Sequence, residues 1–480
     1  MLASPLASSE PFASTYRPGT ATTTLIRGAT VLTGTGERVE GGDVLLSQGR
    51  IQTLGRGLDA PVDARVIDAG GRWVTPGLID IHSHLGLAAS PHVRAHNDFN
   101  EATSPVTAQV WAEHSVWPQD PGFETALAGG VTTLHVLPGS ANLIGGRTVV
   151  LRNVRALSYQ EMKFPGAPQG VKMACGENPK SVYGKKGSAP TTRMAEIAAV
   201  RQAFADAQEY GRQWEKYRED LAKFESKRRG HGSEEAGNDR RKRRKQISTG
   251  DKEKGEHEAQ DQEAPSPPKR DLSKDTLLDV LEGRLPVHVH CYRADEMQTM
   301  LDVAAEFGFR IAAFHHGIEA YKIAARLAEN RVCGALWADW WGFKMEALDG
   351  IPENIALVDR PAHGCAIVHS DSEEGVQRLN QEAAKAMTRG RRLGLDLPPE
   401  RAIRWLTSNP AAALGIAEST GTLEPGKRAD VVIWNREPFS VYALVDEVFI
   451  DGVPVFDRAH PKPPRSDFQL GWAAAGDTLP

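Results

Sequence analysis

The stretch Thr75-Pro-Gly-Leu-Ile-Asp-Ile-His-Ser-His84 decides the fold of this chain. The apolar residues before its first histidine predict a buried strand rather than one with a solvated face. Side chains at positions i and i+2 of a strand point to the same face, so His82 and His84 are expected to project together, with Cα atoms roughly 6.6 Å apart. That spacing allows two imidazoles to reach one metal ion. Two packed histidines at a strand end are the alternative, and the pair alone does not decide between them.

Length and composition describe an ordinary globular protein. The 480 residues are enough for one large core and an accessory domain. The net charge of -5 gives no reason to expect a nucleic acid or a membrane as a partner. No apolar run reaches the ~18 residues of a membrane helix. We expect a cytoplasmic protein as the chain is written, or a periplasmic one if a leader is missing from this start.

The two ends of the chain share one character. Residues 24–75 contain short β-type runs broken by glycines, and residues 420–458 return to the same pattern. We expect these segments to pair into a small β-sandwich module beside the main domain. Residues 1–23 are expected to form a disordered tail, and residues 459–480 a second tail.

Residues 76–419 alternate strands with helices. The run Pro286-Val-His-Val-His-Cys291 predicts a strand, Ala294 to Phe307 a helix, and the alternation continues to Asp371. Such alternation implies an α/β fold with a parallel sheet. Its length and regularity favour a closed, TIM-like (β/α)8 barrel over an open doubly wound sheet. In such a barrel the active site lies at the C-terminal ends of the strands.

A charged insertion at about 225–270 interrupts this alternation. It includes the basic run Arg240 to Lys245 and has almost no aliphatic residues to bury. We expect it to be disordered, or to be a loosely held helical excursion. Acidic residues flank the basic run and no aromatic residues interleave with it, so binding of nucleic acid is not expected.

The four cysteines are widely spaced and form no Cys-x-x-Cys motif. Each lies in an apolar, strand-like run, which predicts buried, reduced thiols. They are Cys175, Cys291, Cys333 and Cys365.

Polar residues collect at the C-terminal ends of the predicted strands. His82 and His84 end the first strand, Lys172 lies in a middle one, and later strands supply further imidazoles and a carboxylate. Several imidazoles and a carboxylate at one end of a barrel suit one or two divalent ions of the zinc type, so metal binding is favoured. The later residues are His288 and His290 on one face, His316 with His315 on the opposite face, and Asp371.

The sequence resembles the amidohydrolase superfamily of metal-dependent hydrolases, in particular its imidazolonepropionase-like and prolidase-like branch. The resemblance covers about residues 24–457 without the charged insertion. Five motifs carry it: Pro76 to His84, Gly130-Val-Thr-Thr133, His369-Ser-Asp371, Thr407-Ser-Asn-Pro410 and Gly426-Lys-Arg-Ala-Asp-Val-Val432.

The resemblance implies a centre with one or two divalent ions, expected to be zinc. The first ion would be bound by His82, His84 and Asp371. The second would be bound by His290 and His316, with His288 as the alternative to His290. We expect the remaining histidines of this region to be packed or supporting residues; they are His135, His315, His363 and His369.

The same resemblance implies a bridging group between two ions, often a lysine carboxylated by CO2. Lys172 fits that position, and its carbamate would offer two anionic oxygens. Glu177 is the alternative bridge. An ordinary strand lysine that points outward is the other interpretation of Lys172.

The implied reaction is hydrolysis of a carbon–nitrogen bond in a small molecule. A metal lowers the pKa of a water toward neutrality, and the hydroxide attacks a carbonyl or amidine carbon. Asp371 would accept the water proton and deliver it to the leaving nitrogen, as general base and then acid. We expect an amide substrate such as a dipeptide, an N-acyl amino acid or a lactam.

A pair of residues that follows His290 in the sequence is a candidate for binding the substrate. Tyr292 and Arg293 can hold a carboxylate, because an arginine binds it with two hydrogen bonds and the hydroxyl adds another. A rim tyrosine and a surface ion pair are the alternative interpretations.

Two other functions compete with amide hydrolysis. Deaminases of the superfamily tend to carry a glutamate about three residues after the fifth-strand histidine, which is absent after His290. A deaminase of an aminated heterocycle is therefore the alternative, and a non-catalytic binding protein comes third. A homo-oligomer is left open.

Overall fold

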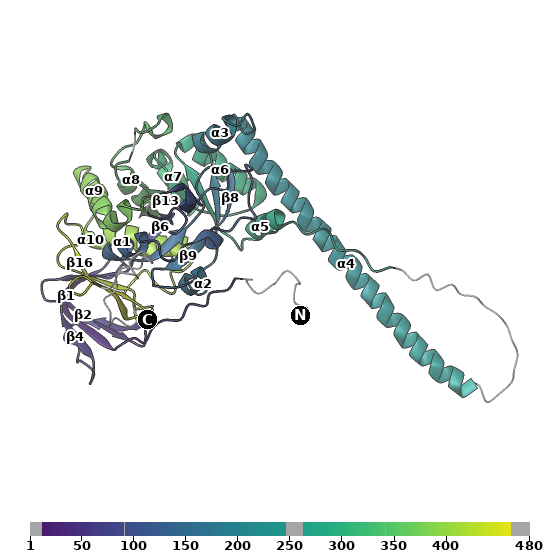
Figure 1. The fold of residues 1–480 in the computed structure, drawn as a ribbon, viewed down its shortest axis with the longest axis horizontal. Coiled ribbons are helices and arrows are strands. Elements are labelled where there is room, and N and C mark those ends of the chain that lie inside the picture. Colours follow the sequence, from purple (N-terminus) through teal and green to yellow (C-terminus); the bar gives the residue numbers. More distant parts are fainter. Residues whose placement is uncertain (1–11, 91, 246–262, 341, 462–480) are drawn as a thin grey trace.

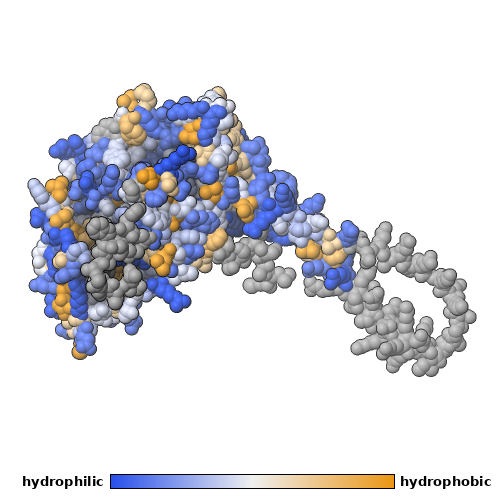
Figure 2. Space-filling view, in the orientation of Figure 1, coloured by the Kyte–Doolittle hydropathy of each residue, from blue (hydrophilic) through white to orange (hydrophobic). Residues whose placement is uncertain are grey.

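The computed structural model describes residues 12–90, 92–245, 263–340 and 342–461. Figure 1 shows a body of strands and helices from which one long helix projects. On the face drawn in Figure 2, hydrophobic residues are scattered over a mostly hydrophilic surface. Within the described ranges, none of the helices is long and apolar enough to cross a membrane.

Two sheets carry the strands of the central domain. The first has the order β6-β7-β9, and the second the order β14-β13-β12-β11-β10-β8. The pairs from β10 to β14 are parallel, whereas β8 and β9 pair with their neighbours antiparallel. The mixed α/β fold is confirmed. The strands are β6 (Leu78–Ser83), β7 (Val131–Val136), β8 (Ile144–Arg147), β9 (Val149–Arg152), β10 (Val171–Ala174), β11 (Val287–Cys291), β12 (Ile311–His316), β13 (Cys333–Leu336) and β14 (Ala366–Val368).

The two sheets are joined at both edges, by a hydrogen bond at one edge and by the continuous chain from β8 to β9 at the other. At one edge, the backbone N–H of Ser370, just after β14, donates to Asp80 Oδ1 of β6 at 3.1 Å. At the other, β8 leads into β9 through Thr148, whose N–H donates to the carbonyl of Gly170 at 2.9 Å. The closed eight-stranded barrel itself stays a prediction.

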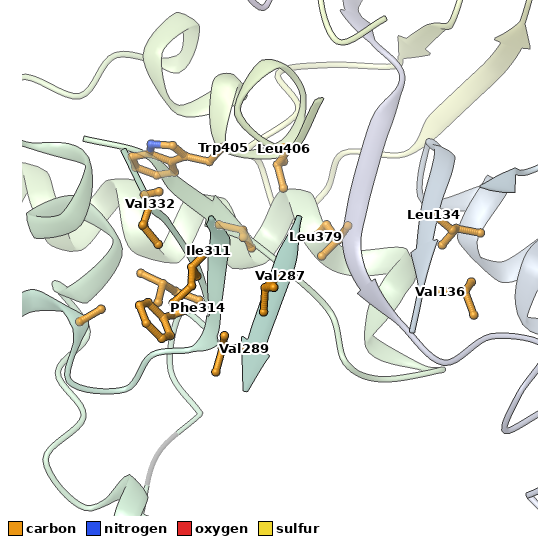
Figure 3. Packing of buried hydrophobic residues seen from close by; sticks show 14 of the residues in the cluster. Leu134, Val136, Val287, Val289, Ile311, Phe314, Val332, Leu379, Trp405 and Leu406 are labelled. Atoms are coloured by element: carbon orange, nitrogen blue, oxygen red, sulfur yellow. The ribbon is translucent and has the colours of Figure 1, made fainter. Parts of the chain in front are cut away.

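Helices cover one side of these strands. In β11, Val287, Val289 and Cys291 belong to the main apolar core, beside Phe314 of β12 (Figure 3). Because side chains alternate along a strand, the two histidines of β11 face the other side. The helices are α1 (Gly122–Ala128), α2 (Tyr159–Met162), α3 (Glu177–Gly184), α4 (Arg193–Lys245), α5 (Leu272–Leu281), α6 (Ala294–Phe307), α7 (Ala324–Glu329), α8 (Asn354–Asp359), α9 (Leu379–Arg392), α10 (Pro399–Ala402) and α11 (Ser408–Ala413).

The two ends of the chain meet in one sheet with the order β17-β16-β15-β5-β1-β2-β3, in which β4 pairs with β1. The antiparallel pairing of β5 with β15 joins the N-terminal strands to the C-terminal ones. The division into two packed sheets, as in a sandwich, stays a prediction. The strands are β1 (Thr24–Leu32), β2 (Arg38–Ser47), β3 (Arg50–Gly55), β4 (Arg65–Asp68), β5 (Trp73–Pro76), β15 (Val431–Trp434), β16 (Val445–Ile450) and β17 (Val453–Asp457).

Residues 12–23, expected to belong to a disordered tail, form no helix or strand but are hydrogen-bonded to the body. The hydroxyl of Ser14 donates to the carbonyl of Lys163 at 2.7 Å, and Lys163 Nζ donates to the carbonyl of Phe12 at 2.7 Å. The remaining tail residues, 1–11 and 462–480, lie outside the described residues.

The charged insertion begins as a helix rather than as a disordered segment. Helix α4 continues to Lys245, which corresponds to the alternative of a helical excursion (Figure 1). Near its start it is anchored by Phe204, whose ring stacks on Phe309 at 4.6 Å. Lysine, arginine and glutamate are good helix formers, so a helix can continue where there is little to bury. Residues 246–262 lie outside the described residues.

The expectation of reduced thiols is wrong, because all four cysteines form disulfides. The Cα atoms are 5.4 Å apart in Cys175–Cys291 and 4.6 Å apart in Cys333–Cys365. In the parallel pair β10–β11, Ala174 lies opposite His290, so the next residues on both strands are the two cysteines. Sequence spacing does not reveal that register.

A buried ion cluster ties the central domain to the terminal sheet. Arg152 of β9 donates to both carboxylate oxygens of Asp430, and its Nη2 lies 3.2 Å from Asp451 Oδ2. All three side chains are almost fully buried. This cluster connects segments that are about 280 residues apart.

Replacement of Arg152 is expected to destabilise the fold strongly. In Arg152→Met the buried carboxylate of Asp430 loses its cation, while Asp451 keeps its ion pair with Arg428; the loss of one partner of a buried ion pair costs about 3–5 kcal/mol. Urea unfolding followed by tryptophan fluorescence measures the change. Arg201→Met is the control, because its ion pair with Glu306 is exposed and should contribute far less. Equal effects of the two substitutions would contradict the assignment.

Candidate metal centre

Three side chains meet where β6 and β14 end. Nε2 of His82 lies 3.4 Å from Asp371 Oδ1, and Nε2 of His84 lies 3.3 Å from the same oxygen. Ligand atoms ~2.0–2.1 Å from a tetrahedral zinc ion are themselves roughly 3.3 Å apart. The three side chains therefore fit one divalent ion of that size. His82 is fully buried, whereas Asp371 is 23% exposed and can meet a substrate.

The backbone around these residues is held by a buried carboxylate. Asp80 Oδ1 accepts hydrogen bonds from the backbone N–H groups of His82 at 3.2 Å and Ser370 at 3.1 Å. The Ser370 hydroxyl donates to the other oxygen of Asp80. Burial raises the pKa of Asp80 to about 6, against the effect of these hydrogen bonds. One side chain thus positions the ends of both strands that carry the ligand candidates.

Two of the candidates have an unusual backbone conformation. His316, the last residue of β12, has φ +72°, and Asp371 has φ +47°. Left-handed conformations are uncommon for residues with a Cβ. They cost about 1–3 kcal/mol and persist where the surroundings enforce them, often at functional sites. Both residues therefore have a constrained backbone conformation of the kind often found at functional sites.

A second group of imidazoles adjoins the first. Candidate ligand nitrogens of His82, His316 and His369 lie within 4.8 Å of one another. Burial lowers the pKa of His82 and His316 well below 6.5, and that of His369 to about 4. Both ring nitrogens of His369 are buried without a hydrogen-bond partner among the described residues. Neutral imidazoles with free lone pairs are suited to metal ions.

His369 was expected to be a packed or supporting residue, yet it lies in this group. The signal that could have found it is its place directly after β14, close in sequence to Asp371.

His290 faces the same region. Its ring lies 4.5 Å from that of His316, and its Nδ1 is buried without a partner among the described residues. Burial lowers the pKa of His290 well below 6.5. His288 lies elsewhere, with Nδ1 3.0 Å from Nε2 of His315. The geometry therefore brings His290, and not its alternative His288, to His316.

Lys172 is buried and does not point outward. Its Nζ donates to the carbonyl of Pro138 at 3.0 Å. Burial lowers the pKa of Lys172 to about 7, although Asp371 opposes this change. A large share of its amine is therefore unprotonated near neutral pH, which is the form that reacts with CO2. Glu177, the alternative, begins α3 and belongs to neither of the two groups described above.

Tyr292 lies at the site, but Arg293 does not. The buried ring of Tyr292 is 4.8 Å from that of His290 and 5.5 Å from that of His316. Arg293 is 41% exposed and donates two hydrogen bonds to the carboxylate of Asp295, at 2.9 and 2.8 Å. In this structure its guanidinium pairs with Asp295, as the surface ion pair interpretation expects.

His315, expected on the face opposite to His316, supports His82 from behind. The Nδ1 atoms of His82 and His315 are 2.9 Å apart, and Nε2 of His315 is 3.0 Å from Nδ1 of His288. With Nε2 of His82 used for an ion, Nδ1 of His82 would carry the proton and donate a hydrogen bond to Nδ1 of His315. Nε2 of His315 would then donate a hydrogen bond to Nδ1 of His288. These two hydrogen bonds would set the tautomer and orientation of His82.

Substitution of His315 is expected to weaken metal binding. His315→Phe removes the acceptor for Nδ1–H of His82 and should lower the affinity for a divalent ion about 10–100-fold. Titration of metal-free protein with zinc measures this change directly. His363→Phe, at an exposed histidine, is the matched control. An affinity equal to that of the control would show that His315 only fills space.

The chain is similar to known proteins in sequence and in structure. Residues 369–456 match the amidohydrolase family. A solved structure of an amidohydrolase from Thermotoga maritima shares 34% identity, covers 91% of this chain and 100% of its own, and superposes with a TM-score of 0.73.

Two curated relatives match more distantly. Amidohydrolase tasK of Hapsidospora irregularis is 30% identical over 92% of this chain and 44% of its own length. Imidazolonepropionase of Vibrio cholerae is 31% identical over 24% of this chain and 32% of its own length. The chain thus spans less than half of these curated relatives.

Proposed function

The chain belongs to the amidohydrolase superfamily, and we propose that it is a metal-dependent hydrolase that cleaves an amide or cyclic amide bond of a small molecule. The observation that carries this proposal is the meeting of His82, His84 and Asp371 at distances suited to one tetrahedral ion. The proposal includes a closed (β/α)8 barrel for residues 76–419. It also includes a β-sandwich built from residues 24–75 and 420–458.

The donor set supports a zinc centre, because imidazoles and carboxylates are typical zinc ligands. His82, His84 and Asp371 would hold one ion. A second ion would lie near His290 and His316, with the carbamate of Lys172 between the two. His369 is an additional candidate, since both of its nitrogens are buried and unpartnered within the described part of the chain.

The chemistry divides between the ion and the side chains. A bound divalent ion lowers the pKa of a water molecule and supplies hydroxide near neutral pH. Asp371 accepts the proton at its carboxylate and then transfers it to the leaving nitrogen. Burial raises the pKa of Tyr292, so its hydroxyl stays protonated and can donate to a substrate oxygen.

Metal analysis combined with a substrate panel tests the proposal. We expect stoichiometric zinc in the purified protein and release of an amine from dipeptides, N-acyl amino acids or hydantoin-like rings. Ammonia release from an aminated heterocycle, without amide hydrolysis, would instead identify a deaminase. Absence of both metal and hydrolysis would overturn the proposal.

A further inference from the structure

A group of aromatic side chains lines one side of the candidate centre. The ring of Trp337 stacks on His316 at 4.3 Å and on Trp340 at 5.3 Å, and Phe343 meets it edge-on at 5.9 Å. Trp337 is buried, whereas Trp340 is 39% and Phe343 56% exposed. The aromatic surface therefore runs from the buried histidines to solvent. Such a surface is suited to an apolar group of a ligand.

An ammonium group lies where this surface approaches the histidines. Lys344 Nζ is 4.1 Å from the ring centroid of Tyr292 and donates to Asn178 Oδ1 at 2.6 Å. The amide nitrogen of Asn178 is in turn 3.2 Å from Nε2 of His290. An ammonium has three donors, and Asn178 takes one, so Lys344 keeps donors for a ligand.

Three carboxylates face Lys344. They are Glu346, Glu177 and Glu296, and Arg193 pairs with both Glu346 and Glu296. Glu346 Oε2 is 4.0 Å from Lys344 Nζ. Burial nevertheless lowers the pKa of Lys344, so the loss of solvation outweighs the attraction of these carboxylates. An anionic ligand beside Lys344 would stabilise the charged ammonium, which burial destabilises.

Resting on the proposed hydrolase function, we propose that the substrate is an amide that carries both a free carboxylate and a large apolar or aromatic side group. Lys344 binds the carboxylate, in the role that the sequence suggested for Arg293, and Trp337, Trp340 and Phe343 contact the side group. An N-acyl derivative or dipeptide of an aromatic amino acid has this chemistry. Hydrolysis adds one water across the bond: the acyl carbon gains the OH, and the nitrogen leaves with a proton.

The test compares N-acetyl-phenylalanine with N-acetyl-2-phenylethylamine, which lacks the carboxylate. Amine release gives kcat/KM for each compound with the metal-loaded enzyme. We expect wild type to prefer the carboxylate about tenfold or more. Lys344→Met should bring the ratio close to one, mainly through KM, while Lys344→Arg keeps most of the preference. Lys322→Met, at a lysine paired with Asp349, is the matched control and should leave the ratio unchanged.

The aromatic contribution is tested with Trp340→Ala. We expect this variant to lower kcat/KM for N-acetyl-phenylalanine much more than kcat/KM for N-acetyl-glycine. Metal content shows that each variant is folded, together with activity on the neutral compound for the Lys344 variants and activity on N-acetyl-glycine for Trp340→Ala. If Lys344→Met keeps the wild-type ratio, or if wild type shows no preference, this inference is overturned and the hydrolase function stands. If wild type releases no amine from any amide of the panel, the hydrolase function itself fails.

Discussion

His82→Ala is expected to lose both the bound metal and hydrolysis. Nε2 of His82 and Nε2 of His84 lie 3.4 and 3.3 Å from Asp371 Oδ1, and His82 also belongs to the imidazole group with His316 and His369. The substitution therefore removes a candidate ligand that belongs to both groups of side chains. Metal analysis should show the loss of stoichiometric zinc, and amide hydrolysis should fall below detection.

The matched control for this experiment is His92→Ala. His92 is 58% exposed and lies 4.0 Å from Glu373, so its replacement removes an imidazole without removing a proposed ligand. The control should keep both metal and activity. Full activity of His82→Ala, with metal still bound, would refute the assignment. Loss of activity with metal retained would place His82 in catalysis and not in metal binding.

Lys172→Met is expected to abolish activity, because the bridging carbamate cannot form. In the wild-type protein, activity should fall when metal-free enzyme is reconstituted without CO2 and should recover when bicarbonate is added. Carbamate formation needs the unprotonated amine, and burial lowers the pKa of Lys172 to about 7. The unprotonated fraction is about one half at pH 7 and roughly one tenth at pH 6. At constant dissolved CO2, reconstitution should therefore be about tenfold slower at pH 6 than at pH 8.

Glu177, the alternative bridging residue, predicts different results in the same experiments. If Glu177 is the bridge, Glu177→Gln loses metal and activity, and CO2 has no effect on reconstitution of wild type. If Lys172 is the bridge, Glu177→Gln responds to bicarbonate as wild type does. An identical reconstitution rate at pH 6 and pH 8 would contradict the role of the Lys172 amine.

The sequence predicted β6, β10, β11 and the later parallel strands for a local reason, but not the antiparallel strands β8 and β9. The alternation of apolar runs reports strands and helices, and parallel strands place their C-terminal ends at one edge. His82, His84 and Asp371 could therefore be placed together without coordinates. The sequence also indicates that His316 and Asp371 lie where β12 and β14 end. It does not indicate their left-handed backbone conformations.

Other parts of the site depended on contacts between distant segments. Lys344 reaches Asn178 from a segment 166 residues away, and no periodicity records that approach. Arg293 was a candidate for binding the substrate carboxylate, and in the structure its guanidinium donates to Asp295. The two disulfides likewise depend on which strands are neighbours and in what register. Composition alone also suggested disorder where α4 continues to Lys245.

The stretch from Thr75 to His84 by itself determined a buried strand that delivers two imidazoles, because strand geometry is set within a few residues. Only the tertiary structure decided what those imidazoles meet. The hydrogen bond between His82 and His315, the Asp80 carboxylate that joins β6 to the end of β14, and the Lys344 ammonium beside Tyr292 all connect segments far apart in sequence. Such contacts arise from packing of the whole chain, which local propensity does not encode.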